Sequence, residues 1–578
     1  MRRVYAGRNI RSAHELNHDL EHLLPLTHLA GLAQAVDLLS ATLHKHKRIL
    51  IVADFDADGA TACALAVRGL RLLGAADVRY VVPNRFEFGY GLTPEIVAVA
   101  AQQTPDLIIT VDNGISSIEG VRAARQLGMQ VLITDHHLPG AVLPLADAIV
   151  NPNQPGDEFP SKNLAGVGVI FYVMLALRAK LRENGWFALN NISEPNLGQL
   201  LDLVALGTVA DVVPLDHNNR ILVAQGLARI RQNRCNAGIR ALIAVAGRQQ
   251  GGISASDLGF AVAPRLNAAG RLEDMSLGIE CLLCDDDTAA LAYACRLNEL
   301  NHERRTIETG MQEQALSALA AMKLDVDNLP SGLCLFNPTW HQGVIGILAS
   351  RIKDRLHRPV IAFAQTGEDE LKGSARSVPG LHIRDALDAI AARHEGLLSK
   401  FGGHAMAAGL SLKLADFETF SAAFNAEVRR HLSESQLQGL LESDGVLAAS
   451  EIGLELAEVI RAAGPWGQGF PEPVFNGTFE IASARVVGVK HLKLLLRPAG
   501  SPRLCDAIAF NVDSAVLSAL TQKEPTAKPQ HTGQASGVST VHIAYKLDVN
   551  EYRGERTVQL LVQQMDCVSS LERNGLGE

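Results

Sequence analysis

The sequence predicts an α/β protein whose first half is an open parallel β-sheet wrapped by helices. Short apolar runs alternate with segments of helical periodicity, and polar residues gather where several of these runs end. The apolar runs lie at 48–53, 77–83, 106–111, 129–134 and 146–150, and the helical segments lie near 60–74, 93–103 and 117–127. Ligands of such sheets bind beyond the carboxyl ends of the strands, so the residues there are the first candidates for function.

The length, the apolar runs and the net charge of the chain limit the classes of protein to which it can belong. The 578 residues are enough for three or four domains of about 100–200 residues each. No apolar run approaches the ~18–20 residues that span a bilayer, and the basic N-terminus lacks the apolar segment of a secretory signal. We therefore expect a cytoplasmic protein with no membrane partner. A net charge of −9 argues against nonspecific nucleic-acid binding by the whole surface, but it leaves room for local basic patches.

The first apolar run ends in three aspartates at alternate positions. Asp54, Asp56 and Asp58 begin on one face of an extended chain, and Gly59 lets the backbone turn sharply into the following helix. Carboxylates this close repel one another and raise one another's pKa values. Because a bound cation would remove this repulsion, the stretch predicts a divalent-metal site.

Further candidate ligands follow later in the chain. The third apolar run ends at Asp112, the fourth ends before His136 and His137, and Asp211 interrupts another apolar segment. A lone aspartate at a strand end is more often a cap or turn residue, but four such items on successive strand ends are hard to explain structurally. Carboxylate and imidazole without thiolate favour Mn²⁺ or Mg²⁺ over structural zinc. Four carboxylates also balance two divalent ions, which would lie about 3.5–4 Å apart.

The motifs DxDxDG, VDNG, TDHH and ADVVPL resemble, in this order, those of the DHH phosphoesterase superfamily. Over nearly its full length the chain also resembles the RecJ family of bacterial exonucleases, which degrade single-stranded DNA from the 5′ end to 5′-mononucleotides. The resemblance implies that water activated between two metal ions attacks phosphorus in line, without a nucleophilic side chain. It implies metal ligation by Asp56, Asp58, Asp112, His136 and Asp211, orientation of these ligands by Asp54, and a position beside the scissile phosphate for His137.

The same resemblance divides the chain into five parts. We expect an N-terminal segment at 1–47, a DHH catalytic domain at 48–284, a long connecting helix at 285–325, a substrate-binding DHHA1 domain with a second α/β fold at 326–435, and an OB-fold at 450–570. Three aspartates at 285–287 suit the start of the helix, which would exceed ~50 Å in length.

Alternating runs near the C-terminus predict the small all-β barrel independently. These runs lie at 478–482, 484–489, 492–497, 505–511, 541–548 and 556–562, and a Pro/Thr/Gln/Ser/Gly-rich stretch at 522–540 predicts a loop within the barrel. Residues 481–503 contain five basic residues and no acidic one, so Lys490 and Lys493 are candidate DNA contacts. A solvated basic strand face is the alternative.

Other candidate DNA contacts lie between these regions. Arginine suits phosphate through its fork of donors, and small neighbours allow a backbone to approach closely. The resemblance implies contacts near the 5′ end for Arg85, Arg265, Asn267, Arg271, Ser374 and Arg376, and nucleic-acid contacts for Gly403 and His404. The glycine pair at 402–403, with small residues after it, predicts a tight helix entry that faces an anion. The alternatives are a solvent arginine in a glycine turn and a buried core histidine.

Two other functions stay open at this point. A phosphodiesterase of dinucleotides or short oligonucleotides would use the same chemistry, although such relatives are typically shorter and lack the long helix and barrel. A non-catalytic DNA-binding scaffold would have no need of four clustered carboxylates. For an exonuclease, the resemblance suggests a helicase and a single-strand-binding protein as partners in DNA repair and recombination.

Overall fold

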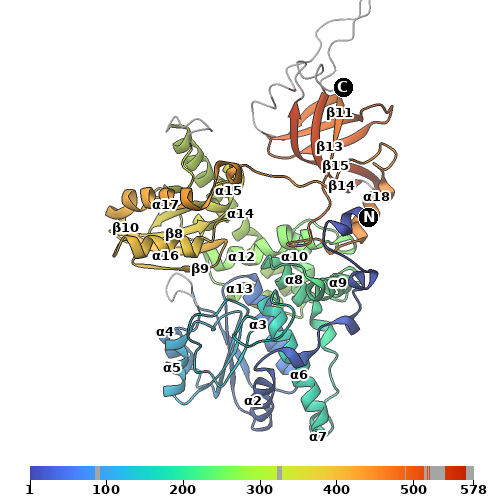
Figure 1. Cartoon of the computed structure of the whole chain (residues 1–578). Coiled ribbons are helices and arrows are strands. Elements are labelled where there is room, and N and C mark those ends of the chain that lie inside the picture. Colours follow the sequence, from blue (N-terminus) through green and yellow to red (C-terminus); the bar gives the residue numbers. More distant parts are fainter. Residues whose placement is uncertain are drawn as a thin grey trace, which may run out of the picture.

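The computed structural model describes residues 1–84, 91–321, 329–488, 490–512, 517, 520, 540–552 and 554–567. It contains a parallel sheet, a mixed sheet and a closed barrel, each in a separate part of the molecule (Figure 1). The predicted phosphate contact Arg85 lies outside the described residues, as does the predicted loop except for Thr540.

The first sheet is parallel, as the sequence predicts, and the structure gives it the strand order β2-β1-β3-β4-β5. Its strands are β1 (Ile49–Ala53), β2 (Val78–Val81), β3 (Leu107–Val111), β4 (Gln130–Thr134) and β5 (Ala148–Val150). Side chains alternate between the two faces of a strand, so Ile49 and Ile51 pack with one group of helices while Leu50 and Val52 pack with another. Both faces are therefore covered, and polar groups can reach solvent at the strand ends.

Helices surround this sheet. Those on the Ile51 face include α2 (Leu32–His44), α3 (Ala57–Leu72), α6 (Gly166–Glu183) and α8 (Leu201–Ala210), while α4 (Pro94–Ala101) and α5 (Ile118–Gln126) cover the other face. The rest of this domain is helical and comprises α7 (Trp186–Leu189), α9 (His217–Arg231), α10 (Ala237–Val245), α11 (Ala255–Asp257), a π-helical turn (Leu258–Val262), α12 (Ala263–Leu272) and α13 (Ser276–Leu283).

Helix α14 (Asp287–Ala321) leads from this domain towards the second one (Figure 1). Its 35 residues give it a length of about 50 Å. Near its start it packs against α10, α12 and α13, and further along it contacts α15 (Ile345–Leu356).

The second domain is a mixed sheet of order β6-β7-β8-β10-β9 with helices α15, α16 (Ile383–Arg393) and α17 (Phe417–His431). The strands are β6 (Leu333–Phe336), β7 (Val360–Gln365), β8 (Glu370–Arg376), β9 (Lys400–Gly403) and β10 (Ala407–Lys413).

The predicted helix entry after the glycine pair is wrong. Gly402 and Gly403 lie in β9 and pair with Gly409 and Ala408 of β10. Gly403 has a φ of +145°, and a Cβ there would lie 2.4 Å from the Ala407 carbonyl oxygen. The glycine therefore serves the close approach of two strands at a hairpin.

The C-terminal domain is a closed barrel of order β11-β12-β13-β15-β14, accompanied by helix α18 (Leu454–Ala462). Its strands are β11 (Phe475–Val487), β12 (His491–Pro498), β13 (Cys505–Ala509), β14 (Thr540–Tyr552) and β15 (Glu555–Cys567). The predicted runs at 478–482 and 484–489 fall, as far as Val487, in one strand, β11, whose register shifts between Ile481 and Ser483.

The N-terminus belongs with this barrel, although the catalytic domain follows it in sequence. Val4 of α1 (Arg2–Ala6) is part of the barrel's hydrophobic cluster, and Arg8 forms an ion pair with Asp444 at 2.7 Å. Within the described part of the chain, no single helix is long and apolar enough to span a membrane. One bent pair, Leu20–His28 with Leu32–His44, meets the criteria of length and composition with a 91° bend.

Candidate metal centre

The three aspartates after β1 take different positions. Asp56 is the N-cap of α3, and its Oδ1 accepts hydrogen bonds from the backbone N–H groups of Asp58 and Gly59, both at 3.0 Å. Asp54 is buried just before this turn. A Cβ on Gly59 would lie 2.5 Å from the Asp54 carbonyl oxygen, so only glycine permits this tight strand-to-helix connection.

Asp112 follows β3 in a strained backbone conformation. Its φ of 62° is left-handed, which is uncommon for a residue other than glycine, and its side chain is 2% exposed. The next residue holds this corner, because Asn113 Nδ2 donates to the carbonyl oxygens of Val52 at 3.0 Å and Val111 at 2.9 Å. The ends of β1 and β3 are thereby tied together, and the Asp112 carboxylate is positioned beside the three aspartates.

Asp135 organises the two histidines after β4. This buried carboxylate accepts from the backbone N–H groups of Ile115 (2.9 Å), His136 (2.7 Å) and His137 (3.1 Å). It also pairs with His137 Nδ1 at 2.7 Å, which orients the imidazole ring. Burial lowers the pKa of His137, but the carboxylates of Asp135, Asp54 and Asp211 together outweigh burial and raise it to about 9.

The structure brings all the predicted metal ligands together. His136 Nε2 lies 3.1 Å from Asp112 Oδ1 and 3.4 Å from Asp211 Oδ2. In this cluster, three groups of residues have ligand atoms within 4.8 Å of one another: Asp54 with Asp56 and Asp112, Asp58 with His136 and Asp211, and Asp112 with His136 and His137. The first group places Asp54 as close to a cation position as Asp56.

Asp58 and Asp211 reach the cluster from helices. Asp58 accepts from the N–H groups of Gly166 (2.6 Å) and Val167 (3.0 Å) at the N-terminus of α6. Asp211 is the C-cap of α8, so its predicted place at a strand end is wrong, and its side chain is 23% exposed. The apolar segment before it is a buried helix. A short apolar run in the sequence does not show whether the segment is a buried helix or a buried strand.

The protonation behaviour of this cluster favours a bound cation. Burial and the Asp211 carboxylate raise the pKa of Asp58 to about 7, and burial and Asp56 raise the pKa of Asp211 to about 7. Burial and Asp58 also raise the pKa of Asp112 well above its usual value. Burial lowers the pKa of His136, so its imidazole is neutral, and its Nε2 makes no hydrogen bond to any described residue. Crowded carboxylate oxygens around a neutral imidazole nitrogen fit Mn²⁺ or Mg²⁺.

The second domain contributes a histidine to the same place. The ring of His404 stacks on that of His137 with centroids 5.5 Å apart. Burial and the two neighbouring histidines, His137 and then His136, lower the pKa of His404. On the adjacent strand β8, Arg376 Nη1 donates to Ser374 Oγ at 3.1 Å and to the Ala375 carbonyl at 2.8 Å.

The predicted contacts on α12 separate into two kinds. Asn267 Oδ1 accepts from Ala57 N at 2.8 Å and therefore touches the aspartate turn, while Arg271 donates to the Gly343 carbonyl of the second domain at 3.2 Å. The structure does not bring Arg265 to this site. Arg265 is 7% exposed and donates to Ala261, Val245 and Asn298.

The predicted basic surface of the barrel is partly neutralised by residues outside the basic window. Lys493 Nζ lies 3.9 Å from Asp506 Oδ1, and Arg497 lies 3.3 Å from Glu480. Lys490 is exposed in the turn between β11 and β12. Both lysines belong to the barrel, which is a separate domain from the acid cluster (Figure 1).

Sequence reasoning missed several residues that build the centre. The sequence contains a signal for Asp135, since a carboxylate between a strand and two histidines is well placed to orient an imidazole. No sequence pattern points to Gly166. A Cβ there would lie 2.5 Å from the Asp112 side chain, and this close approach depends entirely on how α6 meets β3.

The chain is similar to known proteins over nearly its whole length. Residues 48–208 match the DHH family N-terminal domain, residues 330–430 the DHHA1 domain and residues 443–564 the RecJ OB domain. The single-stranded-DNA-specific exonucleases RecJ of Dickeya dadantii and Escherichia coli are 55% and 53% identical over 565 residues, which is 98% of this chain and 95% of each relative. The crystal structure of RecJ in complex with Mn²⁺ from Thermus thermophilus matches with a TM-score of 0.76 at 31% identity, covering 98% of this chain and 76% of that one. A Mg²⁺ complex from the same organism matches with a TM-score of 0.72 at 28% identity, over 98% of this chain and 74% of that one.

Proposed function

The chain belongs to the RecJ family of single-stranded-DNA-specific exonucleases, and we propose that it hydrolyses single-stranded DNA from the 5′ end and releases 5′-mononucleotides. The observation that carries this proposal is the contact of His136 Nε2 with the carboxylates of Asp112 and Asp211 at the end of the parallel sheet. Buried carboxylates with raised pKa values around a neutral imidazole form a site for cations, and cations at such a site suit the hydrolysis of phosphodiesters.

We assign the metal ligands from this geometry. Two divalent ions, Mn²⁺ or Mg²⁺, would be held by Asp56, Asp58, Asp112, His136 and Asp211, with Asp54 beside Asp56 and Asp112. When bound, such ions supply the positive charge that favours ionisation of an attacking water and neutralises charge developing on the phosphate. The backbone N–H groups of Gly166 and Val167 hold Asp58, and Asn113 holds the Asp112 corner.

We infer that His137 acts on the substrate phosphate. Because its pKa is raised to about 9, His137 carries a proton at neutral pH and donates from its ring to a phosphate oxygen. Asp135 keeps the ring in place, and the stacked ring of His404 covers it from the second domain.

Residues around the centre hold the strand. Ser374 and Arg376 are already joined by a hydrogen bond and present two donors for a phosphate, while Asn267, Arg271 and Arg85 would contact the strand near its 5′ end. Gly403 and His404 would face the nucleic acid. Lys490 and Lys493 extend the binding surface onto the barrel, a fold that commonly carries single strands.

We place this activity in the cytoplasm, where a bacterial chromosome is found. A nuclease that takes unpaired DNA needs a duplex to be opened first, so a helicase and a single-strand-binding protein are the expected partners in repair and recombination. Adding a helicase should allow the protein to degrade one strand of a duplex. No stimulation by a helicase that opens the duplex efficiently would argue against this partnership.

The test of the function uses end-labelled single strands with Mn²⁺ or Mg²⁺. A 5′-labelled strand should release labelled mononucleotide at once, and a strand with a blocked 5′ end should resist. Equal degradation of blocked and unblocked strands would refute the polarity. A dinucleotide should be a poor substrate, and Asp112→Asn, which removes one carboxylate of the centre, should abolish turnover on every substrate.

A further inference from the structure

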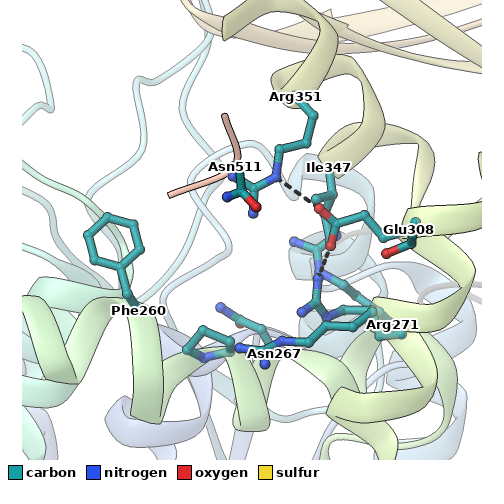
Figure 2. Close-up of a pocket in the computed structure, with 11 residues that line it drawn as sticks. Phe260, Asn267, Arg271, Glu308, Ile347, Arg351 and Asn511 are labelled. Atoms are coloured by element: carbon teal, nitrogen blue, oxygen red, sulfur yellow. Dashed lines mark hydrogen bonds and ion pairs between the residues drawn. The ribbon is translucent and has the colours of Figure 1, made fainter. Parts of the chain in front are cut away.

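Two cavities lined by arginines differ in how the charge of these arginines is balanced. The larger cavity, of about 560 Å³, contains Asn267 and Arg271 and therefore belongs to the strand contacts already described. Figure 2 shows that the Glu308 carboxylate supplies a counter-charge there, since it pairs with Arg351 at 2.9 Å. The smaller cavity, of about 240 Å³, lies where the catalytic domain meets the barrel and its helix α18, and no part of the proposed function uses it.

The smaller cavity is formed by elements from both of these domains. Helices α9 and α11 of the catalytic domain provide one side, and the end of α18 with residues 464–466 provides the other. In Figure 1, α9 and α18 lie near the N-terminus, on the side of the molecule away from the second domain. Six of the residues that line the cavity carry the relevant chemistry: His18, Arg231, Ser256, Arg461, Trp466 and Glu472.

The two cavity arginines, Arg231 and Arg461, come from different domains and are fixed by the same loop. Arg231, the last residue of α9, donates from Nε to the Ile253 carbonyl oxygen at 2.8 Å. Arg461 of α18 donates from Nη2 to the Gly252 carbonyl oxygen at 2.6 Å. Partial burial and then the charge of Arg461 lower the pKa of Arg231, so the two cations are close enough to repel each other.

The carboxylates near the cavity arginines are already neutralised by other cations. Glu472, on the cavity wall, pairs with Lys546 at 3.0 Å. Asp257 pairs with Arg248 at 3.2 Å. In the part of the chain that the structure describes, no carboxylate lies within 4.0 Å of either cavity arginine. The cavity therefore presents two guanidinium groups that no described side chain neutralises, which favours an anion.

Other groups in the cavity suit the rest of a ligand. The Nε2 atom of His18 is buried and makes no hydrogen bond to any described residue. Burial is the main cause that lowers the pKa of His18 to about 4, so its imidazole is neutral at pH 7 and can form a hydrogen bond without adding charge. Ser256 adds a hydroxyl group, and Trp466 adds apolar surface.

We propose that this cavity binds a phosphate monoester between the guanidinium groups of Arg231 and Arg461. A phosphate monoester carries a charge of about −1.5 to −2 at pH 7, which matches two guanidinium groups, whereas a carboxylate would balance only one of them. The planar fork of arginine N–H donors also fits phosphate oxygens. Small-molecule sites usually measure ~300–1,000 Å³, so a smaller cavity suits an anion of this size.

The metal centre would itself supply such a ligand. Hydrolysis that leaves a 5′-mononucleotide produces one phosphate monoester in each turnover, and the nucleoside part of this product would lie against Trp466. The choice of a mononucleotide rests on the proposed function, whereas the anion site does not. Because Arg231 belongs to the catalytic domain and Arg461 to the helix of the barrel, a bound phosphate would also tie these two domains together.

The first test measures binding to the full-length protein in EDTA by titration calorimetry, so that no metal ion holds phosphate at the metal centre. The ligands compared are thymidine 5′-monophosphate, inorganic phosphate, thymidine and acetate. The two phosphates should bind, and thymidine and acetate should bind at least about tenfold more weakly. Tighter binding of the nucleotide would identify the reaction product as the ligand, and equal binding would identify free phosphate. Acetate bound as tightly as phosphate, or no binding of phosphate, would overturn the inference.

Variants of the cavity arginines locate the bound phosphate. Arg231→Gln and Arg461→Gln should each weaken binding by about 10- to 100-fold, the loss expected for a hydrogen bond between charged groups. Arg229→Gln is the matched control, because Arg229 also lies on α9 and donates to a backbone carbonyl, that of Arg234 at 3.1 Å, but does not line the cavity. Arg376→Gln should keep this binding, which distinguishes it from phosphate held near the metal centre. Unchanged affinity in both cavity variants would refute the site.

A substitution on the cavity wall tests the same site without removing an arginine. Ser256→Asp would place a carboxylate where it can pair with the cavity arginines. It should raise Tm in phosphate-free buffer and abolish the rise in Tm that phosphate causes in the wild type. Ser256→Asn, which has the same shape without the charge, should change neither. A rise in Tm with phosphate that persists in Ser256→Asp would contradict the inference.

These outcomes are separable from the fate of the proposed function. If phosphate binding depends on Arg231 and Arg461 but Mn²⁺ supports no hydrolysis, the anion site stands and the nuclease assignment fails. If hydrolysis proceeds and neither arginine affects phosphate binding, the nuclease assignment stands and the anion site is refuted.

Discussion

The imidazole ring of His404 stacks on that of His137, with ring centroids 5.5 Å apart and planes inclined by 22°. His137 follows a strand of the parallel sheet, whereas His404 lies in the β9–β10 hairpin of the second domain. The neighbour of His137, His136, contacts the carboxylates of Asp112 and Asp211. The second domain therefore forms part of the centre, and its position relative to the first should affect catalysis.

Loss of the His404 ring should lower kcat. We expect His404→Ala to reduce kcat by about 10- to 100-fold, because His137 loses the ring that covers it and displacement of a positioned group costs this order of rate. Strand binding in EDTA should change much less. His404→Phe is the control for packing, and recovery of activity in this variant would assign His404 to positioning. An unchanged kcat in His404→Ala would show that the stacking has no catalytic role.

The glycine at the start of α6 should be essential. In Gly166→Ala, the new methyl group would lie 2.5 Å from the Asp112 side chain, so the carboxylate must move. We expect about 100-fold lower activity and weaker Mn²⁺ binding, measured by kinetics and titration calorimetry. Gly310→Ala on α14 is the matched control, since nothing lies within 4 Å of a Cβ there and alanine favours a helix by about 0.5–1 kcal/mol. Wild-type activity in Gly166→Ala would contradict the assignment of Asp112.

Asp135 should set the pH range of activity. Burial lowers the pKa of His137, and Asp135, with smaller effects of Asp54 and Asp211, raises it to about 9, so activity that needs the protonated ring should fall as pH rises through about 9. In Asp135→Asn the counter-charge is lost, the pKa of His137 falls, and the basic limb of the kcat–pH profile should move to lower pH. Activity at neutral pH should drop by about 10- to 100-fold. An unmoved basic limb would exclude His137 as its origin.

The metal-free protein should lose stability as pH rises. The folded-state pKa values of Asp58 and Asp211 are raised from 3.8 to about 7, so the stability they contribute is complete below 3.8 and is lost as pH rises through about 7. Thermal unfolding in EDTA should reveal this trend, and Asp211→Asn should weaken it. Mn²⁺ should raise Tm more at alkaline pH than near about pH 5, because it binds the charged carboxylates. The same Mn²⁺ effect at both pH values would contradict this account.

Arg265 and Arg271 should differ although both belong to α12. Arg265 is buried and donates to Ala261, Val245 and Asn298, so Arg265→Gln should lower the free energy of unfolding by about 1–3 kcal/mol. Arg271→Gln should weaken strand binding in EDTA and leave Tm nearly unchanged. Denaturant titration and fluorescence anisotropy measure the two effects. If Arg265→Gln weakened only DNA binding and left the free energy of unfolding unchanged, Arg265 would be a substrate contact and the prediction from its burial would be wrong.

Much of the fold was predictable because local pattern and tertiary environment agree. A strand buried on both faces, such as β1, is a continuous apolar run, and the helix after it begins with a capping aspartate, Asp56. The sequence pattern gave wrong predictions where two kinds of secondary structure have the same pattern of residues. The apolar segment before Asp211 is a helix, and the glycine pair at 402–403 belongs to a hairpin. Arg265 and Arg271 look alike in sequence, and only the burial of the first separates them.

The sequence by itself determined most of the chemical groups that this protein can bring to a metal, because carboxylates and imidazoles at the carboxyl ends of neighbouring strands of a parallel sheet must meet at one edge. Only the tertiary structure decided how they are held. The amides of α6 on Asp58, the glycine that admits Asp112 and the ring of His404 on His137 all depend on the relative placement of elements distant in the chain. Periodicity describes which face of an element is buried, and it contains no information on what packs against that face.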